Sequence, residues 1–131
     1  MLVGQNDRQG LEGIHVLVID FDSDVRELVR RVLEPLGALV TTTTAAGAAE
    51  TTIVADVILC DLELVEATGH VFLAGLRAKH HHRGRPAPAL AFVTGGSPTD
   101  ARVRAAGFQR YILKPIDPDA LRRAVWQLTA R

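Results

Sequence analysis

The amino-acid sequence predicts an α/β protein built on an open, doubly wound parallel sheet. Five short apolar runs alternate with stretches of helical periodicity, which is the order expected for successive βα units. The apolar runs do not alternate with polar residues, as is typical of parallel strands covered on both faces. A closed eight-stranded barrel needs far more chain than 131 residues, so the sheet is expected to be open.

Each predicted element has its own signal in the sequence. The predicted strands are His15–Asp20, Ala38–Thr42, Asp56–Cys60, Ala89–Val93 and Phe108–Leu113. Helices are predicted from the apolar positions between Val25 and Leu36 (closed by Gly37), over Ala45–Val54, around Val71–Leu76, over Thr99–Ala106 (ended by Gly107), and from Asp117, with Pro118 in the first turn. The segment directly after Asp61 is interpreted as a loop.

The composition of the chain argues against several classes of protein. Fifteen basic and fifteen acidic residues cancel, so no strong field favours nucleic acid or an anionic membrane. The single cysteine, Cys60, excludes an internal disulfide and fits a reducing compartment. The apolar runs are too short to cross a membrane, and we expect a cytoplasmic protein. Residues 1–13 are polar and predict a tail or linker, and residues 14–131 form the single predicted domain.

Charged and hydroxyl side chains follow four of the predicted strands. Asp20 ends the first strand, Asp61 follows the third, Thr94 follows the fourth, and Lys114 follows the fifth. In an open α/β sheet the ligand site lies beyond the carboxyl ends of the strands, so these side chains should share one rim. Carboxylates there suit Mg²⁺, while a hydroxyl and an ammonium suit the oxygens of a phosphoryl group. An aspartate can then act as the nucleophile.

The segments VLVIDFDSDVREL, DVILCDLELVEATGH, ALAFVTGG and RYILKPIDPDAL resemble the response-regulator receiver family of two-component signalling, over roughly residues 14–130. The resemblance implies a flavodoxin-like fold with strand order 2-1-3-4-5. It also implies that Asp61 is phosphorylated, that Thr94 is the switch hydroxyl, and that Lys114 binds phosphate before a proline whose preceding bond is usually cis. Tyr111 matches the aromatic residue that changes rotamer with the threonine.

The same resemblance implies partners. A histidine kinase or a histidine phosphotransfer protein would supply the phosphoryl group, and the domain would catalyse its own phosphorylation and dephosphorylation. The fourth and fifth α/β units would form the partner-facing or homodimer surface. The ending AAGFQRYILKPIDPDALRRAV is most similar to receivers attached to hybrid sensor kinases, which favours a receiver cut from a larger chain over a stand-alone regulator.

The chain departs from the family beside the metal site. Receivers usually carry two adjacent acids after the first strand, but here Phe21 follows Asp20, and a phenyl ring supplies no metal ligand. Asp22 or Glu63 can compensate, so the predicted Mg²⁺ ligands are Asp20, Asp61, Glu63 and Asp22. If neither compensates, Mg²⁺ affinity should fall and phosphorylation should slow.

Several of these residues have a second interpretation. Asp22 precedes a helix and is more often an N-cap than a ligand. Tyr111 is equally well explained as a half-buried strand aromatic, and Cys60 is best explained by packing. The tract Lys79–Arg83 suggests metal binding, but adjacent histidines in a basic loop splay apart, so a solvated or partner-facing loop is preferred.

Three functions therefore compete. The leading one is a phosphoacceptor receiver with Mg²⁺ as its cofactor. The alternative is a pseudo-receiver, a phosphorylation-independent binding or dimerisation module, and Phe21 is its best support. A flavodoxin-like redox or nucleotide protein fits the fold but not the residues, because acids follow the first strand where a phosphate loop would be needed.

Overall fold

The computed structural model describes residues 10–48, 53–95 and 99–130. The main strands are β1 (His15–Ile19), β2 (Leu39–Thr43), β3 (Val57–Asp61), β6 (Ala89–Val93) and β7 (Arg110–Leu113). The helices are α1 (Ser23–Leu33) with a 3₁₀ turn at Glu34–Leu36, α2 (Ala45–Ala48), α3 (Leu62–Thr68), α4 (His70–Lys79), α5 (Asp100–Ala105) and α6 (Pro118–Thr129). Two short strands, β4 (His81–His82) and β5 (Arg85–Pro86), form a separate hairpin.

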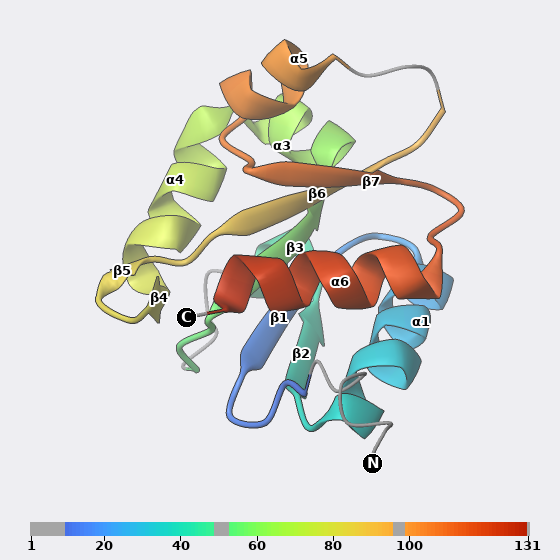
Figure 1. Ribbon diagram of the computed structural model, residues 1–131. Helices are drawn as coiled ribbons and strands as arrows, with labels where there is room; N and C mark the ends of the chain where they lie inside the picture. The colour runs from blue at the N-terminus through green and yellow to red at the C-terminus, as the bar shows by residue number, and fades with distance from the viewer. Residues whose placement is uncertain (1–9, 49–52, 96–98, 131) are drawn as a thin grey trace.

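The five main strands form one parallel sheet in the order β2-β1-β3-β6-β7 (Figure 1). Counted along the chain, this is the predicted 2-1-3-4-5 order, and the flavodoxin-like fold is confirmed. The order reverses beside β1, so the carboxyl ends of β1 and β3 flank the point at which ligands bind in sheets of this type. The predicted strand ends differ from the observed ones by at most two residues.

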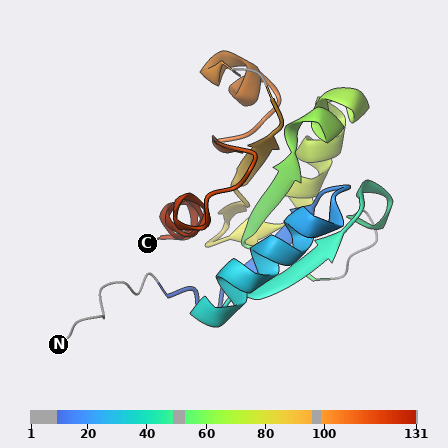
Figure 2. The ribbon, with the colours of Figure 1, turned by 90° about the vertical axis from the view of Figure 1, so that its right-hand side faces the viewer.

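The two faces of the sheet carry separate cores, as the lack of polar alternation predicts. In β1, Leu17 and Ile19 pack into one core while Val16 and Val18 pack into the other. The core of Leu17 lies under α3, α4 and α5, and the core of Val16 lies under α1 and α6. Figure 2, in which α6 is seen almost end-on, shows helices on both sides of the sheet.

The packed structure begins before Ile14. Leu11 lies within the predicted tail, yet its side chain is 1% exposed and belongs to the core under α1 and α6. Its backbone N–H donates to the carbonyl of Leu36 at 2.8 Å. The end of the predicted tail is therefore anchored on the domain, while residues 1–9 lie outside the described residues.

One loop prediction is wrong, and one helix prediction is wrong in part. The segment after Asp61 is a helix, α3, because the Asp61 side chain caps its first turn and Leu62, Leu64 and Val65 are buried. Within Ala45–Val54, only Ala45–Ala48 is helical among the described residues. Ile53 and Val54 are exposed and not helical, and residues 49–52 lie outside the described part of the chain.

The predicted basic loop at Lys79–Arg83 is also corrected. Lys79 ends α4, and the following residues form the β4–β5 hairpin, in which His82 pairs with Arg85. Its two turn residues, Arg83 and Gly84, have φ values of 57° and 80°. A two-residue turn with both residues left-handed matches the twist of antiparallel strands.

Among the described helices, none is long and apolar enough to cross a membrane.

Candidate phosphoacceptor site

The sheet places the four predicted rim residues at its carboxyl edge. Asp61 is the last residue of β3, and Asp20, Thr94 and Lys114 each directly follow the last residue of β1, β6 and β7. Because neighbouring parallel strands are in register, residues that end adjacent strands lie side by side. The fold thus brings residues from four distant segments to one place.

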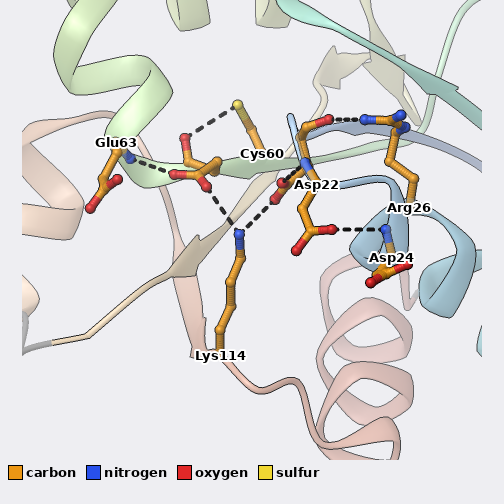
Figure 3. A network of polar contacts seen from close by, with 8 residues as sticks. Asp22, Asp24, Arg26, Cys60, Glu63 and Lys114 are labelled. Carbon is orange, nitrogen blue, oxygen red and sulfur yellow. Dashed lines mark hydrogen bonds and ion pairs between the residues drawn. The ribbon is translucent and has the colours of Figure 1, made fainter.

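Lys114 joins the two carboxylates. Its Nζ atom lies 3.0 Å from Oδ2 of Asp61 and 3.0 Å from Oδ2 of Asp20, as the dashed lines at Lys114 show (Figure 3). The Lys114 backbone N–H donates to the carbonyl of Val93 at 2.8 Å, which fixes the base of the side chain against the end of β6. The Lys114–Pro115 bond is cis, as the resemblance implied. One ammonium is therefore shared by two acids.

Asp61 is fixed from both sides. Oδ1 accepts a hydrogen bond of 2.8 Å from the Glu63 N–H, so the side chain caps α3, while Oδ2 faces Lys114. The side chain is 11% exposed, enough for a small donor to approach one edge of the carboxylate. The carbonyl of Asp61 accepts a weak bond from the Cys60 thiol.

Asp20 is the most deeply buried member of the site, at 1% exposure. Its Oδ1 atom accepts a bond of 2.8 Å from the Asp22 N–H, and its backbone carbonyl accepts one from the Arg26 guanidinium. Oδ2 is fully buried and has the ion pair with Lys114 as its contact, without a hydrogen bond among the described residues. The Lys114 ammonium is therefore its only polar partner among the described residues.

The structure does not bring Asp22 and Glu63 into the same cluster. The Asp22 carboxylate caps α1 by accepting a bond of 2.9 Å from the Asp24 N–H, in agreement with the N-cap interpretation. Glu63 is exposed, and Figure 3 shows its side chain directed away from the Lys114 ammonium. Phe21 is 71% exposed. Among the described residues no three side chains of metal-ligating type are grouped to hold an ion.

The two proposed switch residues lie near the site without joining it. Thr94 is exposed directly after β6 and makes no hydrogen bond to Asp61 or Lys114. The following residues 96–98 lie outside the described part of the chain. Tyr111 in β7 is half-buried against the core under α3, α4 and α5, and lines a cavity with Val103 of α5.

Electrostatics agrees with this geometry. Burial alone would lower the pKa of the Lys114 ammonium, but the hydrogen bonds and attraction from Asp20 and Asp61 outweigh burial and raise that pKa. Burial, followed by the charges of Asp61 and Asp20, raises the pKa of the Cys60 thiol far above its ordinary range. Cys60 is a buried packing residue, and its raised pKa disfavours the thiolate, which is the reactive form.

The histidine tract does not form a metal site among the described residues. His80 is buried, His81 is exposed, and the His82 ring contacts Asp56 and the carbonyl of Thr129, so the three side chains lie in different surroundings. The signal that sequence reasoning missed is the turn at Arg83-Gly84, where the glycine suits a left-handed residue.

Comparison with known proteins decides the family. The sequence profile described as "Response regulator receiver domain" matches residues 16–126. This chain is a member of that family. A protein of Leptolyngbya boryana, the "Uncharacterized 14.6 kDa protein in sodA1 3'region", is 31% identical over 91% of this chain and 92% of its own length.

Other relatives and solved structures are also response regulators. The Alginate biosynthesis transcriptional regulatory protein AlgB of Pseudomonas putida is 35% identical over 95% of this receiver, which spans 28% of AlgB. Among solved structures, a response regulator receiver protein from Pseudoalteromonas atlantica has a TM-score of 0.69 at 22% identity, covering 87% of this chain and 95% of its own. The chemotaxis response regulator CheY4 of Vibrio cholerae has a TM-score of 0.65 at 24% identity, covering 88% and 98%. Both structures support the fold.

Proposed function

We propose that this receiver domain accepts a phosphoryl group on Asp61 from a phosphohistidine and thereby switches a partner-binding surface. The observation that carries the proposal is the Lys114 ammonium held 3.0 Å from each of the Asp20 and Asp61 carboxylates. A cation in that position is suited to hold an oxygen of an arriving phosphoryl group. The donor would be a histidine kinase or a phosphotransfer protein, and we place the reaction in the cytoplasm.

In the proposed transfer Asp61 is the nucleophile. One carboxylate oxygen of Asp61 attacks phosphorus, the N–P bond of the phosphohistidine breaks, and the departing imidazole takes a proton from solvent. The Glu63 N–H holds the other oxygen of Asp61 and so orients the nucleophile. The product is an acyl phosphate, and the domain would also catalyse its later hydrolysis.

Mg²⁺ fits this site with two protein ligands. Asp20 and Asp61 would hold it, because both carboxylates converge on Lys114 and the buried Oδ2 of Asp20 has no other polar partner among the described residues. Bound Mg²⁺ supplies positive charge that offsets the oxygens of the phosphoryl group. Two carboxylates are within the usual range for Mg²⁺, which keeps several waters, but Phe21 leaves the site one acid short of the family pattern.

Phosphorylation would act on the fourth and fifth α/β units. The added charge, about −1.5 to −2 near neutral pH, would attract the Thr94 hydroxyl toward Asp61. Inward movement of Thr94 would pull the segment before α5, and the cavity beside Tyr111 gives that ring room to follow. The surface of α5, β7 and α6 is then the one that would bind a partner or a second copy of the chain.

The pseudo-receiver remains the alternative, and one observation favours it. Phe21 is 71% exposed at the rim, while Asp22 is committed to capping α1. Neither therefore adds a third carboxylate. In that case the domain would bind its partner without being phosphorylated.

One experiment separates the two functions. The full chain is incubated with acetyl phosphate, with and without Mg²⁺, and its intact mass is measured. We expect a Mg²⁺-dependent phosphoryl adduct that hydroxylamine removes, as for an acyl phosphate. Asp61→Asn should carry no adduct although asparagine still caps α3, whereas Asp100→Asn, an exposed acid in α5, should behave as the unaltered chain. No adduct at high donor and metal concentrations would establish the pseudo-receiver instead.

A further inference from the structure

A cavity of about 480 Å³ lies between the β4–β5 hairpin and the C-terminal end of α6. The hairpin leads into the first residue of β6, so the cavity is at the amino end of the sheet, opposite Asp61. Its volume falls in the range of small-molecule sites. The residues that line it are His82, Arg83, Arg85, Pro86, Pro88, Leu128 and Ala130.

The hairpin wall of this cavity is held in place by hydrogen bonds. The His82 ring has Asp56 Oδ1 at 3.1 Å on Nδ1 and the carbonyl of Thr129 at 2.9 Å on Nε2. These contacts tie the hairpin to the start of β3 and to the end of α6. At the base of the hairpin, the Ala87 N–H donates to the carbonyl of His80 at 2.9 Å. The wall is therefore preorganised for a ligand.

Two arginines line the cavity with unused donors. The guanidinium groups of Arg83 and Arg85 are exposed and have no hydrogen bond or ion pair with a described residue, whereas Arg102 donates two hydrogen bonds to the carboxylate of Glu66. Arg83 also has a φ of 57°, a conformation in which glycine or asparagine is usual. The chain thus places a long cationic side chain where a smaller residue would be less strained, as is found at binding sites.

The stretch of sequence that contains the hairpin is basic, although the chain as a whole is neutral. Between Glu66 and Asp100 the sequence has no acidic residue, and it has four basic ones, Arg77, Lys79, Arg83 and Arg85. The Asp56 carboxylate is already engaged by the His82 ring and by the His15 N–H at 2.7 Å. The carbonyl of Thr129 at the helix end, which would repel an anion, faces the His82 ring.

The remaining lining is apolar. Pro86, Pro88 and Leu128 offer flat or aliphatic surfaces next to the two guanidinium groups. A guanidinium group binds phosphate through two parallel hydrogen bonds and also stacks on aromatic rings. We propose that this cavity binds an organic phosphate of mononucleotide size, with its phosphate on Arg83 and Arg85 and its ring over the prolines and Leu128. The site is independent of phosphorylation at Asp61.

The test is a calorimetric titration of the full chain with adenosine monophosphate, adenosine and inorganic phosphate. We expect the nucleotide to bind at least tenfold more tightly than either fragment, because only the nucleotide uses both halves of the cavity. Arg83→Gly keeps the turn, since glycine favours its φ, and should weaken nucleotide binding at least tenfold. Arg85→Gln should do the same. Arg123→Gln, which removes an exposed arginine of α6 outside the lining, is the matched control and should bind normally.

Three results would overturn the proposal: no binding of the nucleotide, unchanged binding in the Arg83→Gly and Arg85→Gln double variant, or equal loss in Arg123→Gln. The last would mean that diffuse charge attracts the phosphate. Asp61→Asn should bind the nucleotide normally, and loss of binding there would instead place the nucleotide at the acidic rim. Circular dichroism of each variant checks that the fold is retained, and Arg83→Gly alone decides the case if Arg85→Gln unfolds.

Discussion

Lys114 and Asp61 are separated by 53 residues in the sequence, yet Nζ and Oδ2 are 3.0 Å apart. The contact exists only when β3, β6 and β7 are paired in order, so it is a product of the complete sheet. The same ammonium also faces Asp20, which is 1% exposed. Two acids and one cation leave the rim with a net negative charge, which suits Mg²⁺ and opposes the approach of phosphate without it.

Removing this cation should destabilise the fold. In Lys114→Met two carboxylates lose their partner in a largely buried place, and we expect the free energy of unfolding to fall by about 3 kcal/mol. Urea unfolding followed by the fluorescence of Trp126, the one tryptophan in the sequence, measures the change. Arg30→Met is the control, because its ion pair with Glu34 is exposed and should contribute less than about 1 kcal/mol. Equal losses in the two variants would show that Lys114 has no special role in stability.

Restoring the family pattern should strengthen metal binding. Phe21→Asp places a third carboxylate beside Asp20, and we expect Mg²⁺ affinity to rise about tenfold, equivalent to about 1.4 kcal/mol. Phe21 is 71% exposed, so its replacement removes little packing. Calorimetric titration with Mg²⁺ gives the affinity. Phe21→Asn is the matched control, since it has the same shape without the charge. If both variants bind Mg²⁺ as the unaltered chain does, the account of Phe21 as the defect is wrong.

The sheet and the rim were predictable because their signals are local. The strands β1, β3 and β6 are buried along their whole length and give the strongest signals, and Asp61 and Lys114 directly follow two of the predicted strands. Once the strands are known to be parallel, the pairing of the rim residues follows from topology alone. The individual contacts, such as that from Lys114 to Asp20, come from the structure.

What the sequence did not reveal depends on tertiary context. The helix α3 is short, and its burial against the sheet outweighs a weak local signal. Whether the Asp22 carboxylate caps α1 or reaches the metal site depends on where the chain turns after β1. In the structure the carboxylate caps α1. The β4–β5 hairpin has a turn whose first residue is Arg83, where the usual asparagine is absent.

Leu11 should contribute to stability although it lies in the predicted tail. Its side chain is 1% exposed, and we expect Leu11→Ala to reduce the free energy of unfolding by about 3 kcal/mol through lost burial and the cavity left behind. Leu39→Ala is the control, because Leu39 is 60% exposed and should change stability little. Urea unfolding measures both. A loss in Leu11→Ala no larger than that in Leu39→Ala would mean that the chain begins its packing only after residue 13.

Acid should destabilise the amino end of the sheet through His80. Burial, with a smaller contribution from the charges of Lys79, His15 and His81, lowers the pKa of His80 below its ordinary value of 6.5. Burial likewise lowers the pKa of His15, although Asp56 partly opposes it. As pH falls, the unfolded chain therefore binds protons before the folded one does. The stability that these two histidines allow is fully present above about pH 6.5 and is lost below it.

The consequence can be measured on one side chain. His80 Nδ1 accepts a bond of 2.9 Å from the Ala55 N–H, which a protonated ring cannot do. In His80→Asn the amide oxygen can replace Nδ1 as the acceptor without titrating. We expect the melting temperature of the unaltered chain to fall between about pH 7.5 and about pH 5.5, and to fall less in His80→Asn. His81→Asn should keep most of the slope, because His81 is exposed and its charge is the smallest of the contributions to the lowered pKa of His80. If His80→Asn has the same slope as the unaltered chain, the loss of stability in acid comes from other groups, and burial of His80 does not govern it.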